Sequence, residues 1–594
     1  MPVIDRQRIS DGFITLERGV DAGKSPSLLP RNQASFAVNA TMRGGYAKTR
    51  PAFTNIALDF TATNQVDAEA MQTRFQTKMF QGAYNYHFGS NSYLVVAVGG
   101  YIHKINVKTG VVQDITPTTS TGSVSTPDPN PSDIPVFFFQ QAEQYLIIQD
   151  GQSLPILFNG ASSRRSVLSN NEVPVGSAMA YGNGRLWVSR GREFVAGDIV
   201  GGPTEVIQFT ENTYIAEGGA FAVPLDTGDI TAMKFTNQPD SSLGQGELLV
   251  HTTDAVFAVN VPTSRDSWKN VSYPTVRIVA INYGAVSDRS CTLVNGDMFY
   301  RAPDGIRSYI SSRREWKEYG QIPVSREVGP YIANEKQANI ADRTSGVLFD
   351  NRLLMTVTPY TNSSQGIFFR ALTALDFDLV GGTGEKAPAA WEGFWTGLNF
   401  LQILTAEIEN ESRCFVFHID GSCRIQLWEL TKDGKKDNGT NNISCYVETS
   451  SYSFENPFEM KQLEYGELWL DQLEGEVQFD IKYKPNQYPA WVDWHAFTEC
   501  AKSENCDPTD GSCLAFVNYA PMYRTRIRLP QPEDTCEASA SQSNANNAPL
   551  RNGYEMAARI GWTGQARIKG FRMHAYPLTE EPYGQCPEEG LFCV

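Results

Sequence analysis

The chain has 594 residues, of which 41% are hydrophobic and 11% aromatic, and its 50 basic and 66 acidic residues leave a net charge of −16. This length is too great for one simple core, so we expect two or more domains, and the hydrophobic content excludes a disordered chain. The acidic balance argues against ordinary nucleic-acid binding, which needs clustered lysine and arginine, although an acidic wall suits a passage through which DNA slides.

Residues 1–75 predict an irregular N-terminal segment. Residues 19–33 are rich in turn formers, residues 34–40 suit a short strand or helix, and residues 43–51 suit a turn followed by an extended stretch. Residues 1–8 contain no apolar h-region, so we expect no secretory signal and synthesis in the cytosol.

Residues 76–432 repeat one pattern, in which an apolar strand, a tight turn with Gly or Asp-Gly, and a second strand follow one another. Six clear copies turn near residues 99, 151, 190, 254, 304 and 420, and a weaker seventh runs from residues 351–359 to residues 371–377. Copies spaced roughly 40–60 residues apart are typical of a β-propeller. We therefore predict a propeller of six or seven blades, with inserted loops at residues 118–132 and 202–224.

Residues 433–594 predict a second all-β domain that resembles a β-sandwich. Polar and apolar residues alternate as in half-buried strands at residues 463–470, 478–483, 523–529 and 566–573. The polar stretch 532–549 predicts a surface loop. The sequence shows no long helix. Its longest apolar runs are strand-sized, far below the ~20 residues of a spanning helix, so we expect no membrane span.

Most of the ten cysteines lie near the C-terminus. Their spacing lacks the close CxxC pairs of a zinc ribbon. We expect some of these thiols to form disulfides after release from the cell, with reduced thiols as the open alternative. The cysteines in question are Cys500, Cys506, Cys513, Cys536, Cys586 and Cys593.

Two glycine-containing stretches resemble nucleotide-binding loops only superficially. Residues 23–25 read Gly-Lys-Ser, but Gly19 is one residue too close, and Pro26 and Pro30 break the helix that such a loop requires. Residues 381–386 are glycine-rich without a following helix. We interpret the first as a turn and the second as a loop tip.

The sequence shows no catalytic or metal-binding spacing. No G-x-S-x-G elbow is present, and the twelve-residue calcium pattern is not met at residues 507–512. The histidines lack metal-binding spacing, and we interpret them as hydrogen-bonded structural residues: His87, His103, His251, His418, His495 and His574. We therefore predict no catalytic, cofactor-binding or metal-binding residue, and a protein that is not an enzyme.

Two aromatic clusters could in principle stack sugars. They lie at residues 391–395 (Trp-Glu-Gly-Phe-Trp) and 491–494 (Trp-Val-Asp-Trp). Aromatic residues at a period of two are ordinary in blades and sandwiches, so we predict that both clusters pack in cores.

Several stretches, in their order along the chain, resemble the tail nozzle proteins, also called tail hub or tail tube proteins, of short-tailed bacteriophages. Together they cover most of residues 19–430, and their order carries the resemblance. The stretches are residues 25–40, Arg43-Gly44-Gly45, Thr49-Arg50-Pro51, residues 184–188, 196–199, 304–308 and 347–354, Leu375-Asp376-Phe377 and Trp391-Glu392-Gly393. The cysteine-rich residues 496–594 match no part of that family.

The resemblance implies a structural protein of the virion tail, with a propeller body. Six identical subunits would form a tube that docks on a head-to-tail adaptor or portal ring, contacts tail fibres or spikes, and passes genomic DNA during ejection without binding its sequence. The distal end would be closed before infection. The acidic balance agrees with this expectation, because a negative wall repels phosphate.

Two alternatives remain at the level of sequence. The propeller could bind or cleave a host-surface glycan, in which case acidic and aromatic side chains should converge on its central funnel. The chain could also be another tail component, such as a fibre adaptor, which would differ from a nozzle in copy number.

Overall fold

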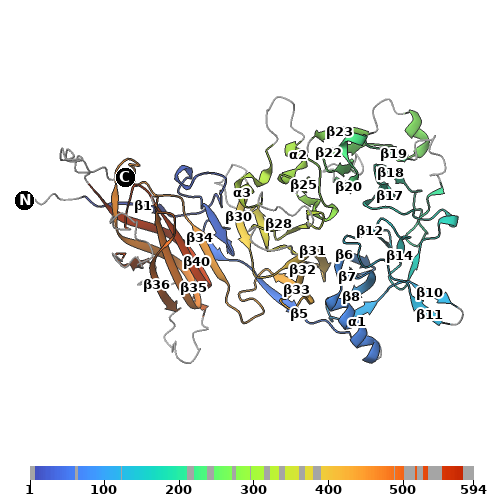
Figure 1. Ribbon diagram of the computed structural model, residues 1–594, viewed down its shortest axis with the longest axis horizontal. Coiled ribbons are helices and arrows are strands. Elements are labelled where there is room, and N and C mark those ends of the chain that lie inside the picture. Colours follow the sequence, from blue (N-terminus) through green and yellow to red (C-terminus); the bar gives the residue numbers. More distant parts are fainter. Residues whose placement is uncertain are drawn as a thin grey trace, which may run out of the picture. The chain divides into compact units, whose positions relative to one another are not determined.

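The computed structural model of the chain describes residues 7–60, 65–121, 124–210, 220–236, 246–270, 276–281, 283–294, 296–312, 322–332, 341–359, 368–378, 389–486, 488–500, 516–517, 526–532 and 551–578. Strands dominate these residues, as Figure 1 shows, and the all-β class predicted from the sequence is confirmed. No helix in this part of the chain is long and apolar enough to cross a membrane.

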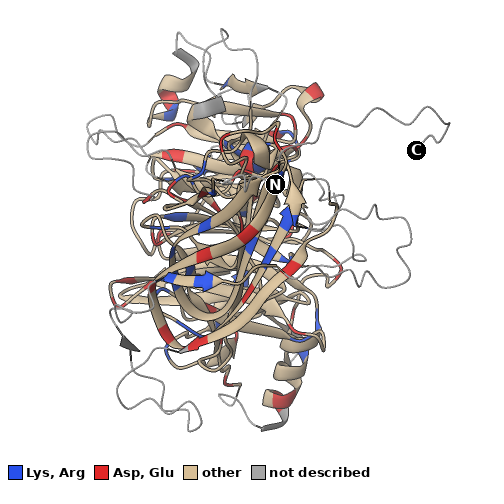
Figure 2. Ribbon diagram, turned by 90° about the vertical axis from the view of Figure 1, so that its left-hand side faces the viewer, with Lys and Arg blue, Asp and Glu red and all other residues tan. Residues whose placement is uncertain are grey.

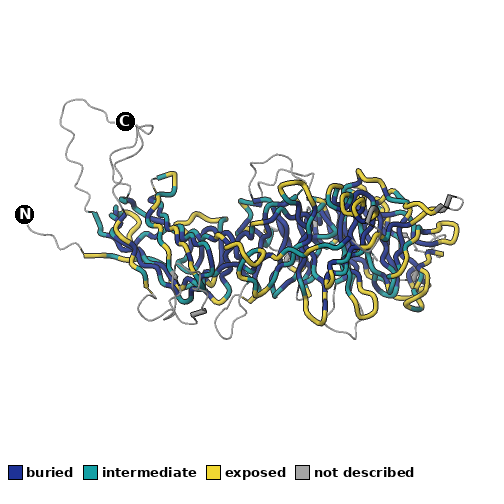
Figure 3. The backbone as a smooth tube through the Cα atoms, turned by 90° about the horizontal axis from the view of Figure 1, so that it is seen from below, coloured by how far each residue is buried: buried dark blue, intermediate teal, exposed yellow. Residues whose placement is uncertain are grey.

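The chain divides into two compact units, each assembled from separate stretches of sequence. Unit 1 consists of Met1–Ala52, Ala374–Trp395 and Asp433–Val594, and unit 2 consists of Phe53–Thr373 and Thr396–Lys432. In both units the buried backbone is surrounded by exposed loops (Figure 3). The N-terminal stretch 1–75, which the sequence treats as one irregular segment, is shared between the units and contains strands and a helix.

Unit 2 contains six small antiparallel sheets that are arranged as the blades of a β-propeller, which confirms the predicted fold. The first three sheets are β6 (Phe80–Phe88), β7 (Asn91–Val98), β8 (Tyr101–Ile105) and β9 (Val112–Asp114); β12 (Phe138–Ala142), β13 (Tyr145–Gln149), β14 (Ile156–Phe158) and β15 (Ser163–Arg165); and β16 (Met179–Gly182), β17 (Arg185–Arg190), β18 (Glu193–Ala196) and β19 (Ala220–Ala222).

The other three sheets complete the blades. They are β20 (Ile230–Phe235), β21 (Leu248–Thr252), β22 (Ala255–Val259) and β23 (Val276–Ile281); β24 (Thr292–Val294), β25 (Asp297–Ala302) and β26 (Gly305–Ser308); and β31 (Phe400–Ile408), β32 (Glu411–Ile419), β33 (Ile425–Thr431) and β5 (Ala52–Ile56). Each of the six clear sequence hairpins is the central hairpin of one of these sheets.

The hairpin between β7 and β8 shows why the pattern is so regular. Val98 pairs with Tyr101 across a two-residue turn, and Gly99 and Gly100 have φ angles of 57° and 85°. Two positive φ angles in succession match the twist of the flanking strands and favour glycine. A Cβ atom on Gly100 would lie 1.9 Å from the Asn130 carbonyl oxygen, so the turn also needs glycine for space.

Neighbouring sheets meet through their first strands, which therefore line the centre of the propeller. β6 packs against β12 and β31, and β16 packs against β12 and β20. The hairpin of β27 (Gly346–Phe349) and β28 (Arg352–Val357), which contains the start of the weak seventh copy, is not one of the six separate sheets; β27 packs against β24 and β31.

Three local features of unit 2 differ from the sequence expectations. The insertion at 118–132 contains the hairpin of β10 (Thr118–Thr121) and β11 (Val124–Pro127). β5, distant in sequence, joins the last sheet beside β33. α1 (Gln65–Thr77) is a 13-residue helix with little amphipathic pattern, so apolar periodicity gave no signal for it, although Met71 and Phe75 are buried.

Unit 1 is organised around two long, bent strands, β35 (Lys461–Pro485) and β40 (Met556–Pro577), which pair along their whole lengths. Register shifts occur near the middle of β35, and such bulges bend strands. One half of the pair continues into β1 (Ile9–Phe13), β38 (Arg526–Leu529) and β39 (Asn552–Gly553); the other half continues into β34 (Ser444–Glu448) and β36 (Val492–Cys500).

The two halves enclose one core, as expected for a sandwich-like domain. Trp494 of β36 lies edge-on to Phe571, which belongs to the other half of β40. The N-terminal stretch contributes β2 (Phe36–Val38), β3 (Ala40–Thr41) and β4 (Ala47–Thr49), and residues 374–395 contribute β30 (Ala390–Trp395). β37 (Phe516–Val517) pairs with β35, and β29 (Ala371–Asp376) ends in this unit.

Candidate functional site

Five of the stretches that carry the family resemblance lie in unit 1, where polar side chains in and beside them form buried hydrogen bonds and ion pairs that we call the motif cluster. It is centred on β2, β3 and β30, and β2 pairs with β30 in parallel and with β34 in antiparallel fashion. The motif cluster consists of Asn39, Thr41, Arg43, Arg50, Asp376, Glu392 and Asp437.

Arg43 and Asp376 form a bidentate ion pair within the motif cluster. Arg43 Nε donates to Asp376 Oδ2 at 2.9 Å, and Nη2 donates to Oδ1 at 3.0 Å. The Asp376 side chain is fully buried, and Arg43 is a quarter exposed. Because the two residues are 333 positions apart in sequence, this pair joins the Arg-Gly-Gly and Leu-Asp-Phe stretches of the resemblance.

Glu392 is a second fully buried carboxylate in the motif cluster. Its Oε1 atom accepts hydrogen bonds from Thr41 Oγ1 at 2.5 Å and from the Met42 backbone N–H at 2.9 Å. The neighbouring Gly393 has a φ angle of 92°, and a Cβ atom there would lie 2.3 Å from the Ala37 carbonyl oxygen. Glu392 therefore stabilises the turn after β3, and Gly393 lets β2 approach β30.

Arg50 links the N-terminal stretch to residues after 432. Its guanidinium donates to both Asp437 carboxylate oxygens, at 3.0 and 2.8 Å, and its Nε donates to Asn39 Oδ1 at 3.0 Å. Asn39 has a φ angle of 55° and donates to the Ser444 carbonyl oxygen at 2.9 Å. Buried bidentate pairs of this kind are costly to break and orient the segments that they join.

The interactions of the motif cluster join segments of unit 1 that are far apart in sequence. Each of its carboxylates accepts hydrogen bonds from arginine, hydroxyl or backbone donors within unit 1. Trp391 and Trp395 beside it are both 1% exposed, so the prediction that this aromatic stretch packs in a core is confirmed. Arg43, Arg50, Asp376 and Glu392 belong to stretches that carry the resemblance. Their structural role could not be predicted from the sequence, because partners such as Arg43 and Asp376 lie hundreds of positions apart.

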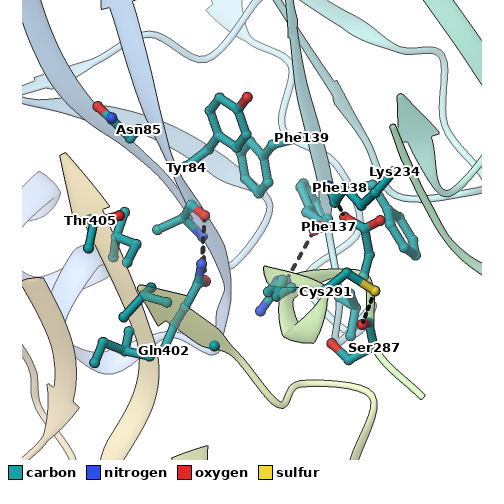
Figure 4. Close-up of a pocket in the computed structure, with 18 of the residues that line it drawn as sticks. Tyr84, Asn85, Phe137, Phe138, Phe139, Lys234, Ser287, Cys291, Gln402 and Thr405 are labelled. Carbon is teal, nitrogen blue, oxygen red and sulfur yellow. Dashed lines mark hydrogen bonds and ion pairs between the residues drawn. The ribbon is translucent and has the colours of Figure 1, made fainter. Parts of the chain in front are cut away.

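The centre of the propeller contains a cavity of about 330 Å³ that is lined by the inner strands of several sheets of unit 2. Figure 4 shows Tyr84 and Phe139 together on one wall, and Lys234 and Cys291 near Phe137 and Phe138. Asp288 is the one carboxylate among the described residues that line this cavity, and it pairs with Lys234 at 3.0 Å. Most glycosidases use two carboxylates, and the described lining contains one.

Burial shifts the ionisation of several groups around the cavity. Burial lowers the pKa of Arg289 to about 10, against the opposing effect of Asp288 and Asp342. Burial also raises the pKa of the Cys291 thiol. The Arg289 guanidinium therefore stays charged at neutral pH, while the Cys291 thiol stays protonated and is a poor nucleophile.

The histidines are not gathered into a metal-binding group in the part of the chain that the structure describes. Among the described residues there is no group of three or more His, Cys, Asp or Glu side chains placed to hold a metal ion. His87 and His418 are hydrogen-bonded, as predicted. His103 and His251 differ from the prediction: both are fully buried, and neither ring nitrogen has a hydrogen-bond partner in the described part of the chain.

The remaining predicted features fall partly within the structure. The Gly-Lys-Ser stretch is a turn in which Lys24 pairs with Asp21, followed by the three-residue 3-10 helix η1 (Pro26–Leu28), as predicted. The loops at 381–386 and 507–512 lie outside the described residues, as do Cys506, Cys513, Cys536, Cys586 and Cys593. Cys500 ends β36, and the predicted disulfides stay a prediction. Four other cysteines are free thiols: Cys291, Cys414, Cys423 and Cys445.

Comparison with known proteins finds no family model and no curated protein that matches the chain. Among solved structures, the chain is similar to one from "Crystal Structure of Mitotic Checkpoint Complex", with 8% identity, coverage of 60% of this chain and 91% of that chain, and a TM-score of 0.33. It is also similar to "AfRom2 CNH domain", with 10% identity, coverage of 64% and 99%, and a TM-score of 0.34. Likenesses this distant carry no conclusion about the function of this chain.

Proposed function

We propose that the chain is a non-catalytic structural protein of a virion tail, similar to the tail nozzle proteins of short-tailed bacteriophages. In this proposal six copies form a ring below the head-to-tail adaptor or portal. The ring conducts genomic DNA during ejection and presents surfaces to tail fibres or spikes.

The observation that carries the proposal is the motif cluster. Five of the stretches on which the resemblance rests lie in unit 1, and two hydrogen-bonded pairs, Arg43 with Asp376 and Arg50 with Asn39, join such stretches directly. A resemblance built from unrelated surface turns would have no reason to select residues that hydrogen-bond to one another.

The charge of the chain supports the conducting role. The net charge is −16, and a negative wall repels the phosphates of a passing duplex. Figure 2 shows acidic and basic residues interspersed on many strands and loops.

Electron microscopy of detached tails, from virions that carry the chain with a C-terminal label, tests the proposal. We expect six labels in a ring around an axial channel. One or a few peripheral labels would instead indicate a fibre adaptor, and label that is absent from tails would overturn a virion role. An unlabelled virion preparation is the control for non-specific label.

A further inference from the structure

The cavity at the centre of the propeller contains an arginine whose hydrogen-bonding capacity is only partly used. Arg289 follows Asp288 in the 3-10 helix η8 (Asp288–Ser290) and lines the cavity. Its Nη2 atom donates to the backbone carbonyl oxygens of Gln81 and Phe137, the latter at 3.1 Å. Within the described residues, neither Nε nor Nη1 has a hydrogen-bond partner.

The backbone of β6 leaves space for the guanidinium of Arg289 at Gly82. Gly82 has no side chain, and a Cβ atom there would lie 2.4 Å from Arg289 Nη2. Gln402 on the neighbouring inner strand β31 donates to and accepts from the Ala83 backbone, both at 2.8 Å, and so fixes β6 beside Arg289. Neighbouring backbone thus positions Arg289, whose side chain lines the cavity.

Two carboxylates near the cavity, Asp288 and Asp342, act on the charge of Arg289. Asp288 is committed to Lys234 Nζ at 3.0 Å and also accepts from the Met233 N–H at 3.3 Å. Asp342 also acts on Arg289 and raises its pKa, while Arg343 acts in the opposite direction. Among the described side chains, neither Asp288 nor Asp342 forms a hydrogen bond or an ion pair with Arg289.

We propose that this cavity binds a small oxyanion, either a carboxylate or a phosphate group, on the guanidinium of Arg289. The Nε–H and Nη1–H groups of Arg289 are charge-assisted donors for the oxygens of such a group, and Lys234 adds positive potential nearby. Tyr84 and Phe138 provide apolar wall for the rest of the ligand. A volume of about 330 Å³ lies at the lower end of the range for small-molecule sites, so the ligand has the size of a single sugar acid or sugar phosphate.

Binding to the full-length protein tests this inference by titration calorimetry at constant ionic strength. The probes are inorganic phosphate, glucuronate and, as a neutral control of similar size, glucose. We expect phosphate or glucuronate to bind and glucose not to bind, and the stronger of the two anions identifies the chemistry of the ligand. Binding of glucose as tight as that of glucuronate, or no binding of either anion, would overturn the inference.

Variants locate the site. Arg289→Gln should weaken anion binding by about tenfold or more, because it removes the positive charge and the guanidinium donors. The matched control is Arg190→Gln, at an exposed position at the end of β17, which should leave binding unchanged. If Arg289→Gln does not fold by circular dichroism, Arg289→Lys serves in its place, with weaker binding expected because the planar fork is lost. Unchanged binding in the folded Arg289 variant would refute the site.

Discussion

At the scale of single residues, unit 1 depends on polar groups that are buried and mutually satisfied. Arg43 and Asp376 are the clearest pair, because their geometry is bidentate and Asp376 is fully buried. The importance of such a pair lies in the penalty for breaking it, since one buried charge is then left without a partner.

We therefore expect Arg43→Ala to lower the free energy of unfolding by about 3 kcal/mol, within the range of about 3–5 kcal/mol for a broken buried pair, because Asp376 also accepts from the Asp378 N–H. The double variant Arg43→Met, Asp376→Leu should recover part of this loss. Denaturant unfolding of Arg43→Met, of Asp376→Leu and of the double variant measures the coupling. A double variant whose loss equals the sum of the single losses would show that the two residues are not coupled.

The buried histidines make unit 2 sensitive to acid. Burial lowers the pKa of His103 to about 4, although the Asp114 carboxylate acts in the opposite direction; the charge of Arg74 adds to the lowering. Burial and the charge of Lys234 lower the pKa of His251 to about 3. Both rings are thus neutral in the folded state. The unfolded chain binds their protons below a pH of about 6.5, so the contribution of each neutral ring to stability is full above that pH. It falls by about 1.4 kcal/mol per pH unit for each histidine as the pH drops from there to the folded-state pKa, about 4 for His103 and about 3 for His251.

Replacing these rings should remove that sensitivity. We expect His103→Leu and His251→Leu each to reduce the fall in Tm between pH 7 and pH 5, measured by differential scanning fluorimetry. His87→Leu is the control, because His87 is exposed and hydrogen-bonded to Asn85 and Ser92. Equal pH dependence in all three variants and the parent protein would contradict the assignment.

At the scale of elements, the sheet of β31, β32 and β33 is completed by β5, which lies more than 300 residues away in sequence. Phe53 of β5 is fully buried and packs edge-on against Phe400 of β31, with 5.8 Å between the ring centroids. An early strand, β5, therefore completes the last sheet of the propeller. Because β31 of that sheet packs against β6 of the first sheet, the ring is closed.

Phe53→Ala should therefore destabilise unit 2 by about 3–5 kcal/mol, as expected for a large aromatic side chain that leaves a cavity. Phe458→Ala is the control, because Phe458 is 88% exposed. Denaturant unfolding followed by tryptophan fluorescence measures both variants. A loss for Phe53→Ala no greater than that for Phe458→Ala would mean that β5 is dispensable for the closed sheet.

At the scale of the whole molecule, each unit is discontinuous in sequence. The core of unit 1 includes Phe13, Leu16 and Val20 from the N-terminal stretch, Ala390 from β30, and many residues after 440. The pairing partners β1 and β4 of β40, and β2 of β34, also come from the N-terminal stretch.

A fragment of residues 433–594 should for this reason fail to fold alone, although the sequence presents it as a domain. It lacks part of its core and exposes the edges of β34 and β40. We expect a poorly dispersed ¹H–¹⁵N spectrum and no cooperative thermal transition, with the full-length chain as the control. Cooperative unfolding of the fragment at the Tm of unit 1 in the full chain would contradict this expectation.

The sequence by itself determined the strands, the turns and the propeller. Hairpins such as Tyr93 to Ile105 are local: alternation, β-branched residues and paired glycines act within about a dozen residues, so they can be predicted without knowledge of the rest of the chain. Only the tertiary structure decided that β5 closes the last sheet, that Asp376 and Glu392 meet the N-terminal stretch, and that Arg289 faces a cavity. Each of these depends on contacts between residues far apart in sequence, because a buried charge takes its partner from whichever segment the fold brings beside it.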